Sequence, residues 1–201
     1  MVSPVFYVWV CAFGVIAYFV AGFRGHEHGR LLGKMGASGA FVVCALVGGA
    51  TDSVAGILIL IGLLASVLGD FFLLRSETRF MAGVYAFVVA HLFYSFAFMA
   101  TGLDGAGFGF GLVIFAPIGW AIWSWVKPHT GVMSKHIALY IGLIFVMTNL
   151  ALAACWEDPG QGQQVLLLSA VTFCVSDVLV ARQKFVCPRR STRRWACRFI
   201  I

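Results

Sequence analysis

Hydrophobic residues occur along this chain in long runs separated by short polar stretches. A helix needs about 20 apolar residues to cross the ~30 Å hydrocarbon core of a membrane. Seven runs approach or reach this length, and each predicts a transmembrane helix. They lie at 4–23, 34–50, 53–74, 80–101, 107–126, 137–155 and 164–181. The pattern therefore predicts an all-α polytopic membrane protein, a helical bundle of seven spans.

Composition supports this fold class. Hydrophobic residues make up 61% of the 201 residues and charged residues 11%, and the mean hydropathy is +0.96. These values are typical of membrane proteins. The second run, MGASGAFVVCALVGGA, is short and rich in small residues, which suits a helix packed among other helices. No linker divides the chain, so we expect residues 1–185 to form a single transmembrane domain, followed by a basic cytoplasmic tail at 186–201.

The charged residues sort by side of the membrane. If successive spans alternate in direction, all 14 Lys and Arg residues fall on one side of the membrane. The charged residues of the opposite loops are then all acidic. Short cytoplasmic loops accumulate Lys and Arg. We therefore expect an external N-terminus and cytoplasmic basic loops, an arrangement that suits a bacterial inner (plasma) membrane. The pI near 9.2 follows from this topology and predicts no nucleic acid partner. The sequence gives no indication of the oligomeric state.

Two acidic residues, Asp70 and Asp177, lie inside predicted spans. Each is followed by four apolar residues and then an arginine, Arg75 or Arg182, which places both carboxyl groups ~7 Å from the basic boundary. An intramembrane carboxylate costs on the order of 2.5–3.5 kcal/mol. Two neighbouring carboxyl groups that share one proton would supply a general acid and a general base. Alternatively, Asp70 pairs with Lys34 or Arg75, and Asp177 pairs with Arg182.

Other polar residues in or near the spans are candidates for substrate binding. They are Lys34, Ser66, His91, Tyr94 and Asn149. Ser66 lies one turn from Asp70 and can donate a hydrogen bond to it. A lone intramembrane histidine such as His91 is more often a packing residue than a catalyst. No group of Cys and His residues has metal-ligand spacing, so we expect no metal and no cofactor.

Two adjoining segments resemble a known signature. GLLASVLGDFFLL, followed by RFMAGVYAFVVAHLFY, resembles the motifs of the YhhN-type family of integral membrane lysoplasmalogenases. LLLSAVTFCVSDVLVARQKF resembles the late helix of that family, and GKMGASGAF resembles its second helix, with Met35 where the family usually has Pro. The family has eight helices. The resemblance therefore implies that the eighth is missing here, or truncated within 186–201.

The resemblance implies hydrolysis of the vinyl ether bond of a lysophospholipid substrate, giving a fatty aldehyde and glycerophospho-ethanolamine or glycerophosphocholine. A vinyl ether resists bases but yields to acid, so the two aspartates fit this chemistry without a metal. One carboxyl group would protonate the outer alkene carbon. The other would stabilise the oxocarbenium ion and deprotonate the attacking water. The head-group phosphate would then contact Lys34, Arg75 or Arg182.

Two other functions use the same aspartates. An intramembrane aspartyl protease would cleave a peptide bond with them, but a Tyr-Asp pair in a preceding helix and a Pro-Ala-Leu segment after the second Asp are absent. A proton-coupled lipid or small-molecule transporter would use them to carry protons. Transporters commonly show interrupted helices at matching places, and here Pro117 alone qualifies. A purely structural membrane protein would leave the intramembrane aspartates unexplained.

Overall fold

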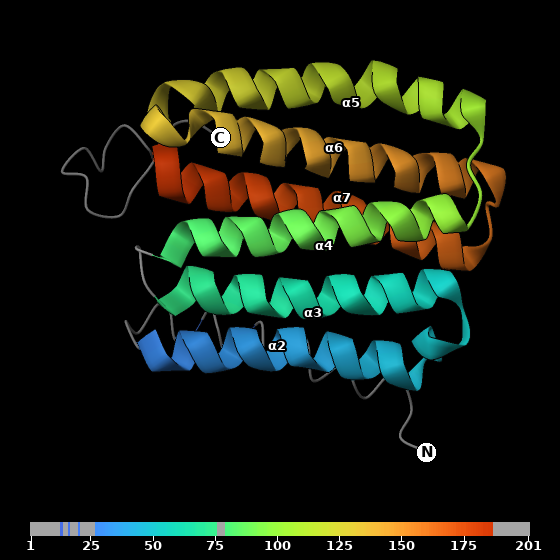
Figure 1. The fold of residues 1–201 in the computed structure, drawn as a ribbon, viewed down its shortest axis with the longest axis horizontal. Helices are drawn as coiled ribbons and strands as arrows, with labels where there is room; N and C mark the ends of the chain where they lie inside the picture. The colour runs from blue at the N-terminus through green and yellow to red at the C-terminus, as the bar shows by residue number, and fades with distance from the viewer. Residues whose placement is uncertain (1–12, 14–15, 17–19, 21–26, 76–78, 187–201) are drawn as a thin grey trace. The chain divides into compact units, whose positions relative to one another are not determined.

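The computed structural model describes residues 13, 16, 20, 27–75 and 79–186, and helices dominate this part of the chain, which contains no strand (Figure 1). The main helices are α2 (Glu27–Val47), α3 (Val54–Arg75), α4 (Phe80–Ala100), α5 (Gly105–Val126), α6 (Ser134–Glu157) and α7 (Gln161–Ala181). The predicted all-α fold class is confirmed. The first predicted span, 4–23, falls almost wholly outside the described residues, and so does the tail at 187–201.

Five helices are long and apolar enough to cross a membrane, namely α3, α4, α5, α6 and α7. The protein is therefore an integral membrane protein. The second predicted span corresponds to α2, whose apolar part, Leu32–Val47, is shorter than these five. Its helix begins at Glu27, several residues before the predicted span, because the polar segment EHGR is also helical. The expected number of seven spans is thus confirmed only in part.

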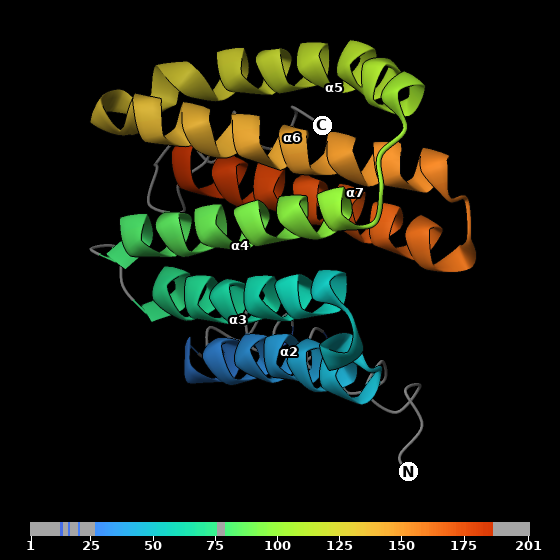
Figure 2. The same ribbon diagram turned by 45° about the vertical axis from the view of Figure 1, so that its right-hand side comes forward.

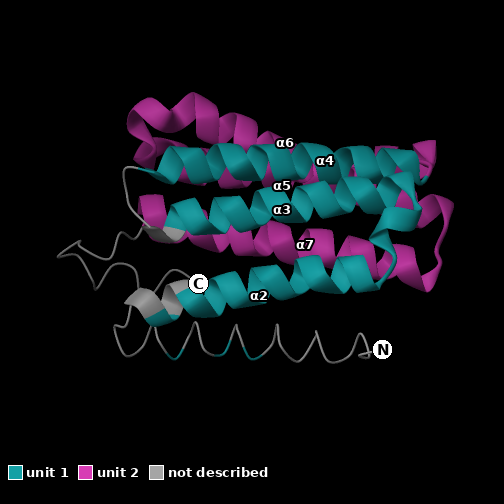
Figure 3. Ribbon diagram, turned by 60° about the horizontal axis from the view of Figure 1, so that its bottom comes forward, with its two compact units in different colours: residues 1–101 teal, residues 102–201 magenta. Residues whose placement is uncertain are grey.

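The chain divides into two compact units, 1–101 and 102–201 (Figure 3). In the first unit, α3 lies between α2 and α4 (Figure 2). Glycines permit close packing of α3 on α4. A β-carbon at Gly69 would lie 2.6 Å from the ring of Phe87, and one at Gly83 would lie 2.9 Å from Leu73. Small residues of this kind let transmembrane helices approach closely.

In the second unit, α6 packs against both α5 and α7, and it contributes the largest set of buried residues of these three helices. The side-chain Oδ1 of Asn149 on α6 occupies the place where a β-carbon at Gly111 of α5 would stand. Two short 3-10 turns, η3 (Lys127–His129) and η4 (Gly131–Met133), connect α5 to α6. Asp104 caps the start of α5 by accepting a hydrogen bond from the backbone N–H of Gly107 at 2.6 Å.

Candidate active site

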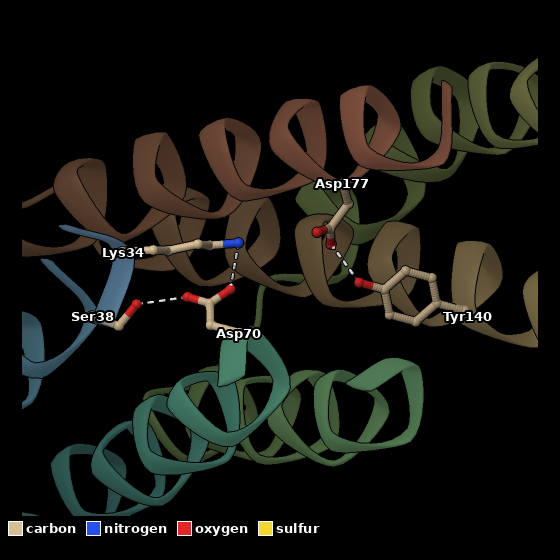
Figure 4. A network of polar contacts seen from close by, with 5 residues as sticks. All are labelled: Lys34, Ser38, Asp70, Tyr140 and Asp177. Carbon is tan, nitrogen blue, oxygen red and sulfur yellow. Dashed lines mark hydrogen bonds and ion pairs between the residues drawn. The ribbon is translucent and has the colours of Figure 1, made fainter. Parts of the chain in front are cut away.

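Asp70 lies near the basic end of α3 and is held by two side chains of α2 (Figure 4). Lys34 Nζ lies 2.7 Å from Asp70 Oδ1, and Ser38 Oγ donates a hydrogen bond to Oδ2 at 2.6 Å. Lys34 and Ser38 are one helical turn apart, so both reach the same carboxyl group from one face of α2. The Asp70 side chain is 12% exposed and that of Lys34 is 28% exposed. Charge-assisted contacts of this length stabilise a carboxylate.

This contact realises one of the pairings left open by the sequence, that of Asp70 with Lys34. The alternative partner, Arg75, has a side chain outside the described part of the structure. Ser38 was not among the predicted residues, although its position one turn after Lys34 was a usable signal. Ser66, which was expected to donate to Asp70, is hydrogen-bonded to Tyr94 instead: the Ser66 Oγ and Tyr94 Oη atoms are 3.1 Å apart.

A second set of polar residues lies on α3 and α4, farther than Asp70 from the basic end of α3. Tyr94 bonds to Ser66, and its ring contacts the ring of His91 edge-on, with centroids 6.4 Å apart. His91 is fully buried, and its Nδ1 donates a hydrogen bond to the backbone carbonyl of Phe87, one turn earlier. These contacts tie α3 to α4 close to Asp70. A role for Ser66, His91 and Tyr94 in substrate binding stays a prediction.

Asp177 lies near the corresponding end of α7 in the second unit. The hydroxyl of Tyr140, on α6, donates a hydrogen bond to Asp177 Oδ2 at 2.9 Å (Figure 4). Tyr140 was missed by the sequence reasoning. A signal was present, because Tyr140 precedes Asp177 by nearly the same number of residues as Lys34 precedes Asp70. Arg182 is half-buried where α7 continues into the π-helical turn η5 (Arg182–Val186), and its predicted pairing with Asp177 stays a prediction.

Asn149 is buried within α6, and its Oδ1 has no hydrogen-bond partner among the described residues. This oxygen lies against Gly111, whose missing side chain leaves room for it. Carbon-bound hydrogens at helix contacts can act as weak donors to such an oxygen. The contact joins α5 to α6, and a role for Asn149 in substrate binding stays a prediction.

Each of the two carboxyl groups thus receives a hydrogen bond from the preceding antiparallel helix. A carboxylate beside an ammonium can accept a proton from water, and a second carboxyl group with a neutral donor can exchange a proton with a substrate. The expected approach of Asp70 to Asp177 stays a prediction. Among the described residues, no three His, Cys, Asp or Glu side chains are grouped in a way that could hold a metal ion.

Comparison with known proteins gives two matches. Residues 29–199 match the sequence model of the YhhN family. The human protein lysoplasmalogenase TMEM86A is 30% identical over 139 residues, which are 65% of this chain and 55% of the human protein. The chain therefore spans about half the length of this relative. No solved structure matches the chain.

Proposed function

Because the chain belongs to the YhhN family, we propose that it hydrolyses the vinyl ether bond of lysoplasmalogens. The products would be a fatty aldehyde and glycerophospho-ethanolamine or glycerophosphocholine. The similarity to human lysoplasmalogenase TMEM86A supports the reaction class. The observation that carries the proposal is the environment of Asp70, a carboxylate that Lys34 and Ser38 hold inside an apolar helix. Such a group is costly in a membrane and is a functional residue by default.

We assign the proton donor of the reaction to Asp177. Its carboxylic acid transfers a proton to the outer alkene carbon of the R–CH=CH–O–R′ group. The alkene electron pair forms the new C–H bond, and the positive charge is shared by the inner carbon and the ether oxygen. The Asp177 carboxylate that results keeps the hydrogen bond donated by Tyr140. This donor stabilises the charge that develops on Asp177, so Tyr140 is a positioning residue.

We assign the base to Asp70, because an ammonium and a hydroxyl already stabilise its charged form. Its carboxylate stabilises the oxocarbenium ion and accepts a proton from the water that attacks the inner carbon. The hemiacetal then collapses. Asp70 returns its proton to the ether oxygen, and the C–O bond breaks to release the glycerol hydroxyl. The hemiacetal hydroxyl gives its proton to Asp177 as the C=O bond of the aldehyde forms. The net change is the addition of one water molecule, and both carboxyl groups return to their starting states by proton exchange.

In this assignment Lys34 neutralises the carboxylate of Asp70 and does not bind the head group of the lipid. The phosphate would contact Arg75 and Arg182, and the alkenyl chain would pass the deeper polar residues Ser66 and Tyr94. We also propose the topology indicated by the basic loops, with both aspartates near the cytoplasmic leaflet. A lysophospholipid can enter such a site sideways from that leaflet with its head group at the boundary.

The reaction is tested by supplying the purified protein in nanodiscs with a lysoplasmalogen and identifying the aldehyde by mass spectrometry. In D₂O, carbon protonation places one deuterium on the carbon next to the aldehyde group. In H₂¹⁸O, the label enters the aldehyde oxygen, provided that the aldehyde is trapped before it exchanges with water. Loss of the lipid without aldehyde would favour transport, and the proposal fails if neither label is incorporated during the enzymatic reaction.

The aspartates are tested by the variants Asp70→Asn and Asp177→Asn. Each should reduce aldehyde release by about a thousandfold, because general acid and general base catalysis each contribute roughly 10²–10⁴ in rate. Asp104→Asn is the matched control. Asp104 is the N-cap residue of α5, and asparagine also caps helices well. A substantial rate in either test variant would remove that residue from the mechanism.

A further inference from the structure

An apolar groove of about 330 Å³ runs along the contact of α5 and α6. One face of each helix lines it, from Phe108 to Trp123 on α5 and from Ala138 to Asn149 on α6. At 1.5 Å per residue these faces are ~22 and ~16 Å long. One leaflet of a bilayer contains ~15 Å of hydrocarbon. The length of the groove therefore matches the thickness of the hydrocarbon layer of one leaflet. Its volume lies within the range of small-ligand pockets, roughly 300–1,000 Å³.

Two lysines continue the faces that line the groove. Lys127 follows Trp123 by one turn, and its backbone N–H donates a hydrogen bond to the Trp123 carbonyl. Lys135 lies in the first turn of α6, three residues before Ala138. Both lysines are exposed, and neither forms an ion pair with another described residue. The connecting segment KPHTGVMSKH contains no acidic residue, so this end of the groove is positively charged.

A groove of hydrocarbon surface that ends near two ammonium groups, neither of them paired with a described acidic residue, complements an anionic amphiphile. A zwitterionic lipid would bring its own cation to Lys127 and Lys135, and a free phosphate ion would leave the groove empty. Basic pockets between transmembrane helices are known to bind anionic lipid head groups. Neither Asp70 nor Asp177 lines this groove. The proposed lipid site therefore uses neither reacting carboxyl group, and it does not depend on the proposed reaction.

We propose that the α5–α6 groove binds one anionic membrane phospholipid, with a hydrocarbon chain along the aromatic lining and the phosphate between Lys127 and Lys135. Such a lipid would fill the gap between the two helices and fix their connection. The bound molecule is a resident lipid and not the substrate. Trp120 and Trp123, which line the groove near its basic end, give the site a fluorescence signal.

The experiment uses the full chain in phosphatidylcholine nanodiscs that contain increasing fractions of a dibrominated lipid, because bromine quenches nearby tryptophan. Dibrominated phosphatidylglycerol should reach half of its quenching at a mole fraction roughly fivefold or more below that of dibrominated phosphatidylcholine. Each lysine near the surface contributes about 1 kcal/mol to anionic lipid binding, which corresponds to roughly fivefold. Lys127→Gln and Lys135→Gln should each lower the preference by this factor. Arg79→Gln, which removes an exposed cation from the first unit, should leave it unchanged.

A second pair of variants tests the groove itself. A β-carbon at Gly142, which lines the groove, meets no atom within 4 Å, and the same is true at Gly109 of α5, which does not line it. Gly142→Leu should fill the groove and abolish the additional quenching by the anionic lipid. Gly109→Leu adds the same side chain elsewhere and should retain that quenching.

Three results would overturn the proposal. Equal quenching by the two brominated lipids would show ordinary contact with bulk lipid. Equal quenching in Gly142→Leu and Gly109→Leu would place the anionic lipid outside the groove. Stronger quenching by a dibrominated zwitterionic lysophospholipid than by the anionic lipid would show that the groove takes molecules of the substrate class instead.

Discussion

The α2–α3 pair of the first unit and the α6–α7 pair of the second unit each hold an aspartate within an apolar helix, but they do so with different hydrogen-bond donors. In each pair the second helix carries an aspartate that precedes an arginine by five residues, and the first helix supplies its partner. In the first unit the partners of Asp70 are an ammonium and a hydroxyl, from Lys34 and Ser38. In the second unit, the phenol of Tyr140 donates to Asp177.

Two similar sequence patterns thus bring different hydrogen-bond donors to their aspartates. The contacts of Asp70 include a full positive charge and therefore stabilise its ionised form, which suits a base. A phenol is a neutral donor, and it can remain bonded to Asp177 while that group gains and loses a proton. Substitution of the side chains that contact each aspartate tests this asymmetry.

The largest effect is expected at Lys34. Lys34→Gln removes the charge that neutralises Asp70 and should lower kcat about 100-fold, because a hydrogen bond to a charged group contributes roughly 1.5–3 kcal/mol and each 1.4 kcal/mol is tenfold in rate. KM should change little. Steady-state measurement of aldehyde release in nanodiscs separates the two parameters.

Two controls accompany this variant. Lys34→Arg keeps the charge and should retain most of the activity, and Arg79→Gln removes a cation elsewhere in the same unit. If Lys34 bound the phosphate of the substrate, KM would rise and kcat would persist in Lys34→Gln. That outcome would contradict the assignment of Lys34 as the residue that stabilises the charged form of Asp70.

A smaller effect is expected at Tyr140. Tyr140→Phe keeps the ring and removes the hydroxyl that donates to Asp177. We expect kcat to fall roughly tenfold, since one hydrogen bond contributes about 1–1.5 kcal/mol. KM should stay near its wild-type value, and Arg79→Gln should leave both parameters unchanged in the same steady-state assay of aldehyde release. A larger loss in Tyr140→Phe than in Lys34→Gln would reverse the assigned roles.

Much of the fold could be predicted because bilayer thickness fixes the length of an apolar helix. The predicted spans at 80–101 and 107–126 correspond to α4 and α5 within a few residues. The start of α2 could not be predicted in this way. Hydropathy indicates which residues lie in the hydrocarbon layer, but it does not indicate the residue at which helical hydrogen bonding begins. Its helix continues through polar residues back to Glu27.

The candidate site was predictable only where a residue type was anomalous. Asp70 and Asp177 stand out because a carboxyl group in an apolar run has a high energetic cost. Serine and tyrosine have no comparable cost, so Ser38 and Tyr140 were marked only by their spacing along the chain from Lys34 and from Asp177. Which hydroxyl reaches a carboxylate depends on the packing register of two helices. Ser66 shows this, because it lies one turn from Asp70 but bonds to Tyr94 on α4.

The smallest effect on kcat is expected from substitution of two serines near Asp70, of which one bonds to its carboxyl group and the other does not. Ser38→Ala removes the hydroxyl that donates to Asp70 and should lower kcat about fivefold, because the contact with Lys34 persists. Ser66→Ala is the matched change on α3, one turn from Asp70, where the hydroxyl bonds to Tyr94 of α4 instead of to the carboxyl group. We expect its kcat to stay within about twofold of the wild type, with any effect confined to KM or to thermal stability. Because both variants lose one oxygen near the same carboxyl group, only a direct contact explains a difference in kcat. Equal losses would mean that the chemistry responds to the polarity of the region and not to the particular donors of Asp70.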